Sequence, residues 1–434
     1  MQLPEDFLQL IRPLFGEERF ERFLKALDEE SAVSIRVNPR IVHSSQCTVN
    51  YELEKVPWCR NGYYLPTRPN FTFDPLLHAG CYYVQEASSM FLDEVLRQHL
   101  PALTAQRPTL QALDLCAAPG GKSTLLRSAL PEGSTLYSNE PIRKRASILL
   151  ENVTKWGYQN HFVTNNYPKD YRKAKMHFDL ILCDVPCSGE GMFRKDPDSI
   201  KEWSLQNVRN CQQLQREIVS DAWECLNDGG LFVYSTCTYN TMEDEENVRW
   251  IQEELKAEIL SVETKPEWGI TGSLLEGFDA PVYRFIPGYT RGEGLFMAVM
   301  RRPLPQPLSQ GEGSGYSDML EKEKSNKLEK RKNNKAKTSL DILNTPLSSG
   351  EGLGERFERV ALTYPQAIAY LRGEALVLPP DTPRGIVTVT FMGQPLGPMK
   401  NIGNRANNLY PKEWRIKSTH VPADYQPVIL ENKQ

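Results

Sequence analysis

Residues 113–124 read LDLCAAPGGKST, a short apolar run followed by a turn of small residues and the start of a helix. The ending GKST resembles that of a phosphate loop, G-x-x-x-x-G-K-[ST]. However, Cys116 stands where the first glycine of that loop belongs, and Pro119 lacks one of the amides that a triphosphate needs. No G-x-G-x-x-G occurs either. The stretch therefore predicts a strand, a tight turn and a helix N-terminus that hold a ligand other than a triphosphate.

Strands and helices alternate on both sides of this turn, from about residue 85 to about residue 300. Helical patterns occupy 121–130, 141–157 and 214–230. The expected strands are short apolar runs at 111–116, 134–140, 161–166, 177–187 and 231–237. Apolar strands joined by helices are typical of a parallel, doubly wound sheet, so we expect an α/β, Rossmann-like domain.

Changes in composition divide the chain into four expected segments. An N-terminal extension (1–84) precedes the catalytic domain (85–302). A flexible, low-complexity linker rich in Ser, Gly, Lys and Glu follows at 303–355. Its basic run KLEKRKNNKAK could touch RNA, but a solvated charged linker explains it equally simply. Apolar content returns at 356–434, where a helix over 360–373 and strands at 375–379 and 385–393 predict a small α+β module.

The composition of the chain excludes several classes of protein. The chain has 434 residues and a net charge of −4, which argues against coating nucleic acid by charge alone. It has no apolar run long enough for a membrane span and no secretory signal, so we expect a cytoplasmic protein. The nine cysteines are scattered without C-x-x-C spacing, which predicts no metal site. In a reducing compartment, a special cysteine is more often a nucleophile than half of a disulfide.

The small residues of the turn favour one kind of ligand. Ala117, Ala118, Gly120 and Gly121 allow close approach to the backbone, and the helix amides face whatever binds there. Glu140 ends the next strand, where a carboxylate can accept hydrogen bonds from ribose hydroxyls, although it could also simply cap a helix. A nucleoside with a carboxylate tail and no phosphate fits both features. S-adenosylmethionine is such a ligand.

Two cysteines follow the fourth and fifth expected strands. Because the carboxyl ends of neighbouring strands meet at one edge of a doubly wound sheet, Cys187 and Cys237 should lie close together, with Asp184 nearby. The alternative is that both thiols only fill the core. A thiol beside a methyl donor suits methylation of a pyrimidine at carbon 5. A thiolate adds to carbon 6, an acid near ring nitrogen 3 assists, and a base later removes the proton on carbon 5.

Three motifs in this order and spacing carry a family resemblance: CAAPGGKS (116–123), DVPCSGEG (184–191) and STCTY (235–239). They resemble the Nop/Sun-type RNA cytosine-carbon-5 methyltransferases, especially the bacterial RsmF-like branch that modifies 16S ribosomal RNA. SIRVNP, VPWCRNGYYLP and GCYYVQEASSM resemble the N-terminal extension of that family, and KNIGNRANNLYPKEWRI resembles the end of its PUA-like RNA-binding module. The resemblance implies S-adenosylmethionine as cofactor and RNA, in 16S rRNA or the small ribosomal subunit, as partner.

The resemblance also implies roles for individual residues. Cys237 would be the nucleophile, Cys187 would assist release of the product, and Asp184 would contact the cytosine edge near the methyl donor. Lys122 would also lie near the reacting base. The residues expected to hold the cofactor are Cys116, Ala117, Ala118, Pro119, Gly120, Gly121, Lys122, Glu140, Asn166 and Asp184.

One position departs from the family pattern. The family often has an acidic residue after the third strand, near the adenine, and here Tyr167 stands in that place. Either Asn166 supplies the hydrogen bond, or the contact is made by stacking. Weaker candidates for RNA contact are Arg194, Lys195, Trp58, Tyr63, Arg405 and Trp414, each of which has core packing or a solvated loop as its alternative.

Two other functions compete with this interpretation. A methyltransferase acting on a protein or amide nitrogen needs no thiol, and it usually has an Asn-Pro pair where this chain has Asp184 to Cys187. A ribosome-assembly factor that only binds RNA needs neither cysteine.

Overall fold

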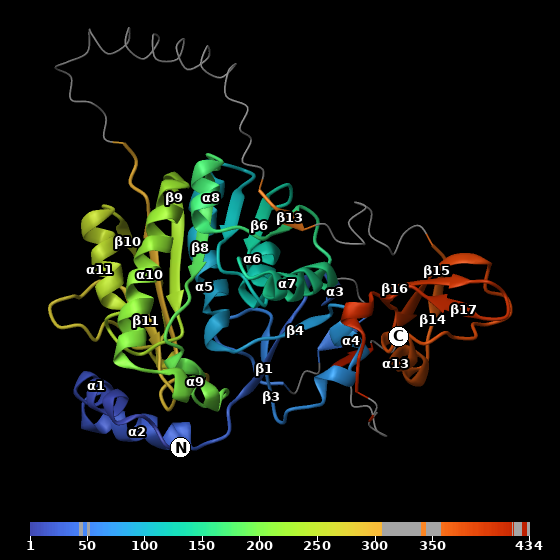
Figure 1. The fold of residues 1–434 in the computed structure, drawn as a ribbon, viewed down its shortest axis with the longest axis horizontal. Helices are drawn as coiled ribbons and strands as arrows, with labels where there is room; N and C mark the ends of the chain where they lie inside the picture. Colours follow the sequence, from blue (N-terminus) through green and yellow to red (C-terminus); the bar gives the residue numbers. More distant parts are fainter. Residues whose placement is uncertain are drawn as a thin grey trace, which may run out of the picture.

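The computed structural model describes residues 1–42, 47–49, 53–305, 340–343, 357–418, 420 and 428–431. Within these ranges, the central sheet has nine strands, in the order β10-β12-β9-β8-β5-β6-β7-β13, with β11 paired to β12 (Figure 1). Its strands are β5 (Gln111–Asp114), β6 (Thr135–Asn139), β7 (His161–Thr164), β8 (Phe178–Asp184), β9 (Leu226–Thr236), β10 (Glu258–Leu260), β11 (Val282–Phe285), β12 (Leu295–Arg301) and β13 (Ile342–Leu343).

The five strands predicted from sequence are the parallel centre of this sheet, β9-β8-β5-β6-β7. The chain runs outward from β5 through β6 to β7, then returns to β8 on the other side of β5. This reversal opens a crevice at the carboxyl end of β5, where doubly wound folds bind ligands. The register pairs Asp184 of β8 with Ser235 of β9, so the two cysteine motifs begin side by side. The Rossmann-like fold is confirmed.

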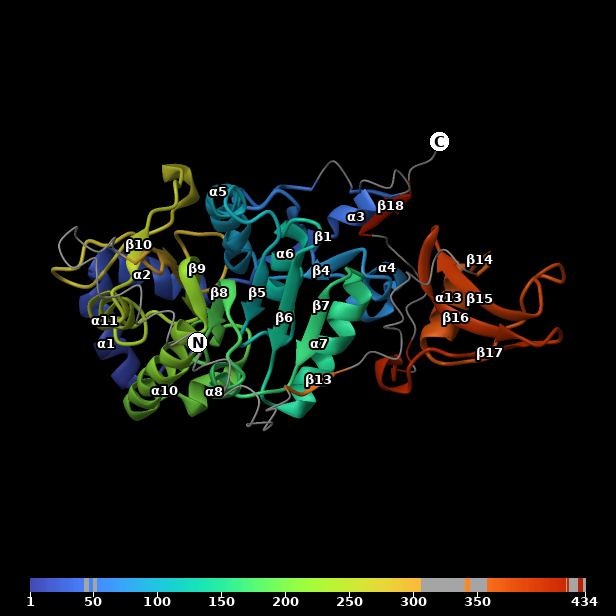
Figure 2. The same cartoon turned by 90° about the horizontal axis from the view of Figure 1, so that it is seen from above.

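Helices cover both faces of the sheet, and alternate residues of each strand face them. Leu180 and Leu182 pack with helices α5 (Leu92–Thr104) and α6 (Gly121–Ala129), whereas Ile181 packs with α10 (Leu205–Glu224). Figure 2 shows α5 and α10 on opposite sides. The remaining helices of this domain are α7 (Arg143–Trp156), α8 (Pro168–Lys173), α9 (Pro197–Glu202) and α11 (Glu245–Glu254).

The N-terminal residues form two helices and a small sheet. Gly16, with a φ of 72°, separates α1 (Glu5–Phe15) from α2 (Glu17–Leu27), and both helices pack on Phe193, Trp203 and Tyr239 of the catalytic domain. The small sheet has the order β3-β1-β4. Its strands and the nearby elements are β1 (Val33–Val37), α3 (Pro39–Val42), β2 (Cys47–Val49), β3 (Gly62–Leu65), α4 (Pro75–His78) and β4 (Tyr82–Val84).

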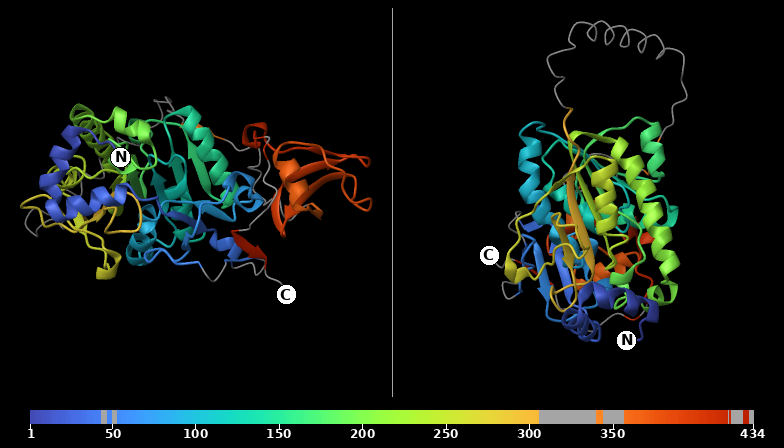
Figure 3. Two further views of the ribbon diagram at one scale, coloured as in Figure 1. Left: turned by 90° about the horizontal axis from the view of Figure 1, so that it is seen from below. Right: turned by 90° about the vertical axis from the view of Figure 1, so that its left-hand side faces the viewer.

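The C-terminal residues form the predicted α+β module at one end of the molecule (Figure 3). Its main elements are β14 (Arg359–Ala361), α13 (Tyr364–Leu371), β15 (Gly385–Phe391), β16 (Gln394–Asn401) and β17 (Ala406–Asn408), and β18 (Ile429–Glu431) pairs with β2. The predicted strand at 375–379 is wrong, because Leu376 makes only an isolated bridge to Ala406. Two prolines follow at once and lack the amide hydrogens that a ladder needs.

The predicted four-segment division of the chain stays a prediction. Most of the proposed linker, including its basic run at 327–337, lies outside the described residues. The part that is described contains β13, a strand that the composition did not predict. Among the helices that the structure describes, none has both the length and the apolar character needed to cross a membrane.

Candidate active site

The two motif cysteines meet at the carboxyl ends of β8 and β9. The Sγ atoms of Cys187 and Cys237 lie 3.2 Å apart, and the backbone N–H of Cys237 donates to Cys187 Sγ at 3.4 Å. Both are free thiols and half-buried. The predicted proximity of the two thiols is confirmed, whereas their chemical roles stay predictions. No cluster of three His, Cys, Asp or Glu side chains suited to a metal ion occurs in the described ranges.

The two thiols have different surroundings. The hydrogen bond to Cys237, burial and the nearby Glu243 raise the pKa of Cys187 well above its ordinary value. A thiol with such a pKa keeps its proton at neutral pH. Cys187 can therefore donate that proton in a hydrogen bond to the sulfur of Cys237.

An ion pair lies at the same edge of the sheet. Lys122 Nζ donates to Asp184 Oδ2 at 2.8 Å, and Ser235 Oγ donates to Asp184 Oδ1 at 2.7 Å. Burial alone would lower the pKa of Lys122, but the Asp184 carboxylate outweighs it and the pKa is raised. The Asp184 side chain remains 33% exposed while Lys122 is 12% exposed. The pair thus holds a proton near the thiols and presents the carboxylate outward.

The glycine turn joins β5 to α6 as predicted. Gly120 has a φ of +117°, a conformation that side chains rarely adopt, and a Cβ there would lie 3.2 Å from Leu149 Cδ1. Helix α6 starts at Gly121, so its free amides face the turn. Burial raises the pKa of the Cys116 thiol. Cys116 therefore contributes an uncharged thiol to this turn.

Asp114, directly before the turn, is a residue that sequence reasoning missed as a site residue. Its Oδ2 accepts from Ser123 Oγ at 2.5 Å, but its Oδ1 is buried without a hydrogen-bond partner. Burial raises the pKa of Asp114 to about 7. An orphaned carboxylate oxygen suits a cation, and the helix amides suit an anion. The ammonium and carboxylate groups of a methionine moiety match this pair, so the residues fit S-adenosylmethionine.

Two predicted cofactor residues already have protein partners. Glu140 is buried; its Oε1 accepts from the Ile142 N–H at 2.9 Å, and its Oε2 lies 3.2 Å from Arg145. Glu140 thus bonds the backbone just before α7, and it does not cap that helix. Asn166 uses its side chain on the backbone of Asp341, with Oδ1 accepting at 3.0 Å and Nδ2 donating at 3.2 Å. Tyr167 is 60% exposed. The cofactor roles of Glu140 and Asn166 stay predictions.

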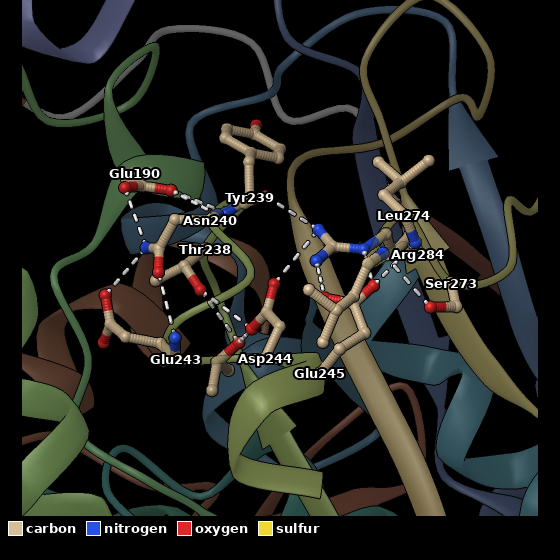
Figure 4. A network of polar contacts seen from close by, with 12 residues as sticks. Glu190, Thr238, Tyr239, Asn240, Glu243, Asp244, Glu245, Ser273, Leu274 and Arg284 are labelled. Atoms are coloured by element: carbon tan, nitrogen blue, oxygen red, sulfur yellow. Dashed lines mark hydrogen bonds and ion pairs between the residues drawn. The ribbon is translucent and has the colours of Figure 1, made fainter. Parts of the chain in front are cut away.

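A buried polar network holds the turn that follows Cys237 (Figure 4). Glu190 accepts from the backbone N–H groups of Tyr239 and Asn240, at 2.6 and 3.0 Å. Asp244 accepts from Thr238 Oγ1 at 2.9 Å and pairs with Arg284 at 3.1 Å. This network was not predicted, because a sequence does not show which charges are buried.

Additional contacts hold the backbone of Cys237 itself and neutralise the acidic side chains of the network. The Arg284 guanidinium also bonds Glu245 and donates to the backbone oxygen of Tyr239. The N–H of Gly191 donates to the carbonyl oxygen of Cys237 at 2.8 Å, and a Cβ on Gly191 would lie 3.0 Å from that oxygen. The nucleophile candidate is thus fixed from both sides by partners on separate elements.

The weaker RNA candidates divide into packed and exposed residues. Every guanidinium nitrogen of Arg194 has an acceptor within the protein, including Glu293 at 3.0 Å, while Lys195 Nζ lies 3.9 Å from Glu293. Trp58 is buried and donates to Ala87, which matches its core-packing alternative. Tyr63 is half-buried beneath Lys55.

The two candidates of the C-terminal module differ in the same way. Arg405 is exposed, whereas the Trp414 ring lies under the Lys155 ammonium of α7, 5.8 Å from the ring centre. Trp414 therefore helps to join the module to the catalytic domain, and Arg405 remains free to reach a partner surface.

Three family profiles match successive parts of the chain. They are described as the N-terminal domain of 16S rRNA methyltransferase RsmF (residues 3–87), 16S rRNA methyltransferase RsmB/F (102–301) and the methyltransferase RsmF PUA domain (357–416). The chain belongs to the RsmB/F family. The resemblance stated from the motifs is confirmed, and S-adenosylmethionine is the cofactor of the RsmB/F family.

Curated relatives extend the match over nearly the whole chain. Ribosomal RNA small subunit methyltransferase F of Pectobacterium atrosepticum is 31% identical over 325 residues, which cover 70% of this chain and 65% of that protein. The proteins of the same name from Enterobacter sp. (strain 638) and Cronobacter sakazakii are 28% and 29% identical, and the alignments cover 94% and 95% of this chain and 95% and 96% of theirs.

Solved structures share the RsmB/F fold. NSun6 from Pyrococcus horikoshii with SFG aligns with a TM-score of 0.55 at 18% identity, over 69% of this chain and 98% of that one. A methyltransferase homologue from the same organism aligns with a TM-score of 0.53 at 24% identity, over 69% and 100%. These likenesses support the Rossmann-like assignment.

Proposed function

We propose that this protein methylates carbon 5 of a cytosine in RNA through a covalent bond between Cys237 and carbon 6 of the base. The observation that carries the proposal is the 3.2 Å contact between the Cys187 and Cys237 thiols at the edge where Lys122 pairs with Asp184. A methyltransferase acting on nitrogen needs no thiol, because its acceptor carries a lone pair. Carbon 5 of cytosine is a poor nucleophile until a thiolate adds to carbon 6.

The cofactor would be held by the β5–α6 turn. The turn from Cys116 to Lys122 offers small residues and helix amides, while the unpaired Asp114 oxygen offers a partner for an ammonium group. Glu140 stays at the end of β6 as the proposed ribose-side acid. S-adenosylmethionine, when bound, supplies an electrophilic methyl group to the activated base.

The residues of this chain would activate the base by adding a thiolate to carbon 6 while a proton moves to ring nitrogen 3. The Cys237 thiolate forms a bond to carbon 6, and the double bond between carbons 5 and 6 opens toward carbon 5. Ring nitrogen 3 takes up the proton that Lys122 and Asp184 hold, which spreads the negative charge. Asp184 is suited to this because its side chain is the more exposed member of the pair. Binding the base there requires it to leave its stack.

Release would reverse the addition. A base removes the proton from carbon 5, the double bond between carbons 5 and 6 re-forms, and the bond to Cys237 breaks with its electrons returning to sulfur. Ring nitrogen 3 gives its proton back to the Lys122–Asp184 pair in the same step, so that the neutral base leaves. Cys187 is placed to assist because its thiol lies against the leaving sulfur and keeps its own proton, the pKa being raised by that contact and by burial. The returning thiolate thus gains a hydrogen bond.

The substrate we propose is 16S rRNA in the cytoplasm. Relatives that share 28–31% identity carry the name ribosomal RNA small subunit methyltransferase F. The PUA profile and the N-terminal RsmF profile match the two flanking parts of the chain. We assign both parts to RNA docking, with Arg405 as an exposed candidate contact.

Nucleoside analysis tests this function. The purified protein is incubated with radiolabelled S-adenosylmethionine and small ribosomal subunits, or naked 16S rRNA, from cells that lack the protein, and the RNA is digested. Label in 5-methylcytidine, absent with Cys237→Ala, is the expected result. Label in another nucleoside would contradict the proposed acceptor. RNA binding without any label would favour an assembly factor that has lost turnover.

A further inference from the structure

A short piece of the chain far from the catalytic domain in sequence completes the edge of its sheet. Strand β13 pairs antiparallel with β7, in the register Ile342 with Thr164 and Leu343 with Val163. Figures 1 and 2 show it, in orange, at the end of the sheet near α7. The N–H of Asn165 donates to the carbonyl oxygen of Asp341 at 3.0 Å. The segment 340–343 thus docks at the carboxyl end of β7, at the ligand edge.

The contacts of this segment involve residues assigned to the cofactor site. Asn166 holds the backbone of Asp341 through both atoms of its amide, over a separation of 175 residues. The Asp341 carboxylate, 58% exposed, lies 3.1 Å from Arg143 at the start of α7. Next along the same helix turn, Arg145 pairs with Glu140. Two acids from different parts of the chain therefore stand at the ends of β6 and β7.

The side chain of Leu343 joins β13 to the apolar packing that includes one residue of the cofactor turn. It packs on the apolar cluster that contains Ala117 of the turn, Leu149 of α7 and Val163 of β7, with Ala118 at its border. The side chain of Ile342, one residue earlier, is 43% exposed and belongs to no such cluster. Leu343 thus belongs to the same apolar packing as Ala117 of the turn.

We propose that Asp341 and Leu343 are positioning residues of the cofactor site, and that docking of β13 and binding of S-adenosylmethionine stabilise each other. A two-residue edge strand held by a few hydrogen bonds and one partly buried leucine is only marginally stable alone. A ligand that binds the turn favours the conformation in which that turn is supported. Linkage then requires the docked strand to favour the ligand by the same factor. The inference rests on the cofactor site of the proposed function, but not on the methylated base.

A matched pair of substitutions on β13 tests the coupling. Leu343→Ser removes an apolar side chain from the cluster that contains Ala117 of the turn, whereas Ile342→Ser makes a similar apolar-to-polar change on the exposed side of the same strand. Isothermal titration calorimetry with S-adenosylmethionine should show an affinity at least about fivefold weaker for Leu343→Ser and within about twofold of the wild type for Ile342→Ser. Asp341→Pro, which removes the N–H that Asn166 accepts, should weaken binding in the same direction without changing an apolar contact.

Hydrogen exchange gives a second readout that needs no catalysis. In the wild type, saturating S-adenosylmethionine should slow exchange of the Asp341 amide by the factor that calorimetry finds. Equal affinity in Leu343→Ser and the wild type, or an Asp341 amide indifferent to the cofactor, would overturn the inference. If β13 docking and cofactor binding are coupled but no 5-methylcytidine forms, the inference stands and the proposed function is rejected. If 5-methylcytidine forms without that coupling, the proposed function stands and the inference is rejected.

Discussion

At the scale of single residues, two groups that keep their protons lie beside Cys237, the nucleophile of the proposed mechanism. Cys187 keeps its proton because the contact with Cys237 and burial raise its pKa. Lys122 keeps its proton because the pull of the Asp184 carboxylate exceeds the effect of burial on its pKa. In the proposed mechanism Cys237 is therefore the reacting thiol, and Cys187 and Lys122 are the neighbours that keep their protons.

Asp184→Asn should therefore lower kcat by about 10²- to 10⁴-fold, since the amide cannot share a proton with ring nitrogen 3. Asp179→Asn is a matched control. It breaks an ion pair with Arg107, 2.6 Å long, at the opposite end of the same strand. Steady-state methylation assays of both variants check the expectation. Equal losses in kcat would indicate a general effect of strand β8 instead.

Asp114 predicts a pH dependence of cofactor affinity. Burial raises its pKa to about 7, so in the free protein the carboxyl is largely neutral below pH 7 and charged above it. Because only the charged form attracts an ammonium group, affinity for S-adenosylmethionine should rise about fivefold between pH 6 and pH 7. It should fall again above about pH 8, where the α-amino group of the ligand loses its proton.

Calorimetry across this pH range measures the effect, and Asp114→Asn should flatten it. The charges of Lys122 and Asp184 affect the pKa of Asp114, and the charge of Asp114 affects the pKa of Cys116 and Cys183; the variant retains all four groups. An unchanged slope in Asp114→Asn would assign the titration to another group.

At the scale of elements, the buried network fixes the turn after β9. Arg284 of β11 neutralises Asp244 and Glu245, and all three side chains are almost fully buried. Arg284→Met should destabilise the protein by about 3–5 kcal/mol, because it leaves buried charges unpaired. Arg301→Met, on the neighbouring β12, loses only an exposed pair with Glu258 and should cost less than about 1 kcal/mol. Urea denaturation of both variants decides; similar midpoints would refute the structural role of the network.

The elements also show what a sequence can reveal. The central strands were predicted because each is an apolar run bounded by helical patterns, and the cysteine contact followed from the edge that parallel strands share. Strand β13 was not predicted, since it consists of two residues and its pairing partner, β7, lies far away in the sequence. Asp114 and the pair of Glu190 and Arg284 were missed as site residues because burial, not residue type, makes them special.

At the scale of the whole molecule, the N-terminal part shares one apolar core with the catalytic domain and another with the C-terminal module. Phe23 of α2 packs on Tyr239, two residues after Cys237, with ring centres 5.0 Å apart. At the other end, Tyr364 of the C-terminal module donates to the carbonyl oxygen of Phe73 at 3.1 Å. The N-terminal part therefore packs against the turn that follows Cys237, while the C-terminal module is held by the N-terminal part.

The central claim is that Cys237 bonds covalently to the base, and trapping that bond tests it most directly. Cys187→Ala protein is incubated with 16S rRNA and S-adenosylmethionine and run on a denaturing gel, beside the double variant with Cys237→Ala and a Cys211→Ala control. Cys211 is another half-buried thiol, on α10. We predict a shifted protein–RNA band for Cys187→Ala alone. No band while Cys187→Ala still forms 5-methylcytidine, or a band that survives the loss of Cys237, would contradict the account.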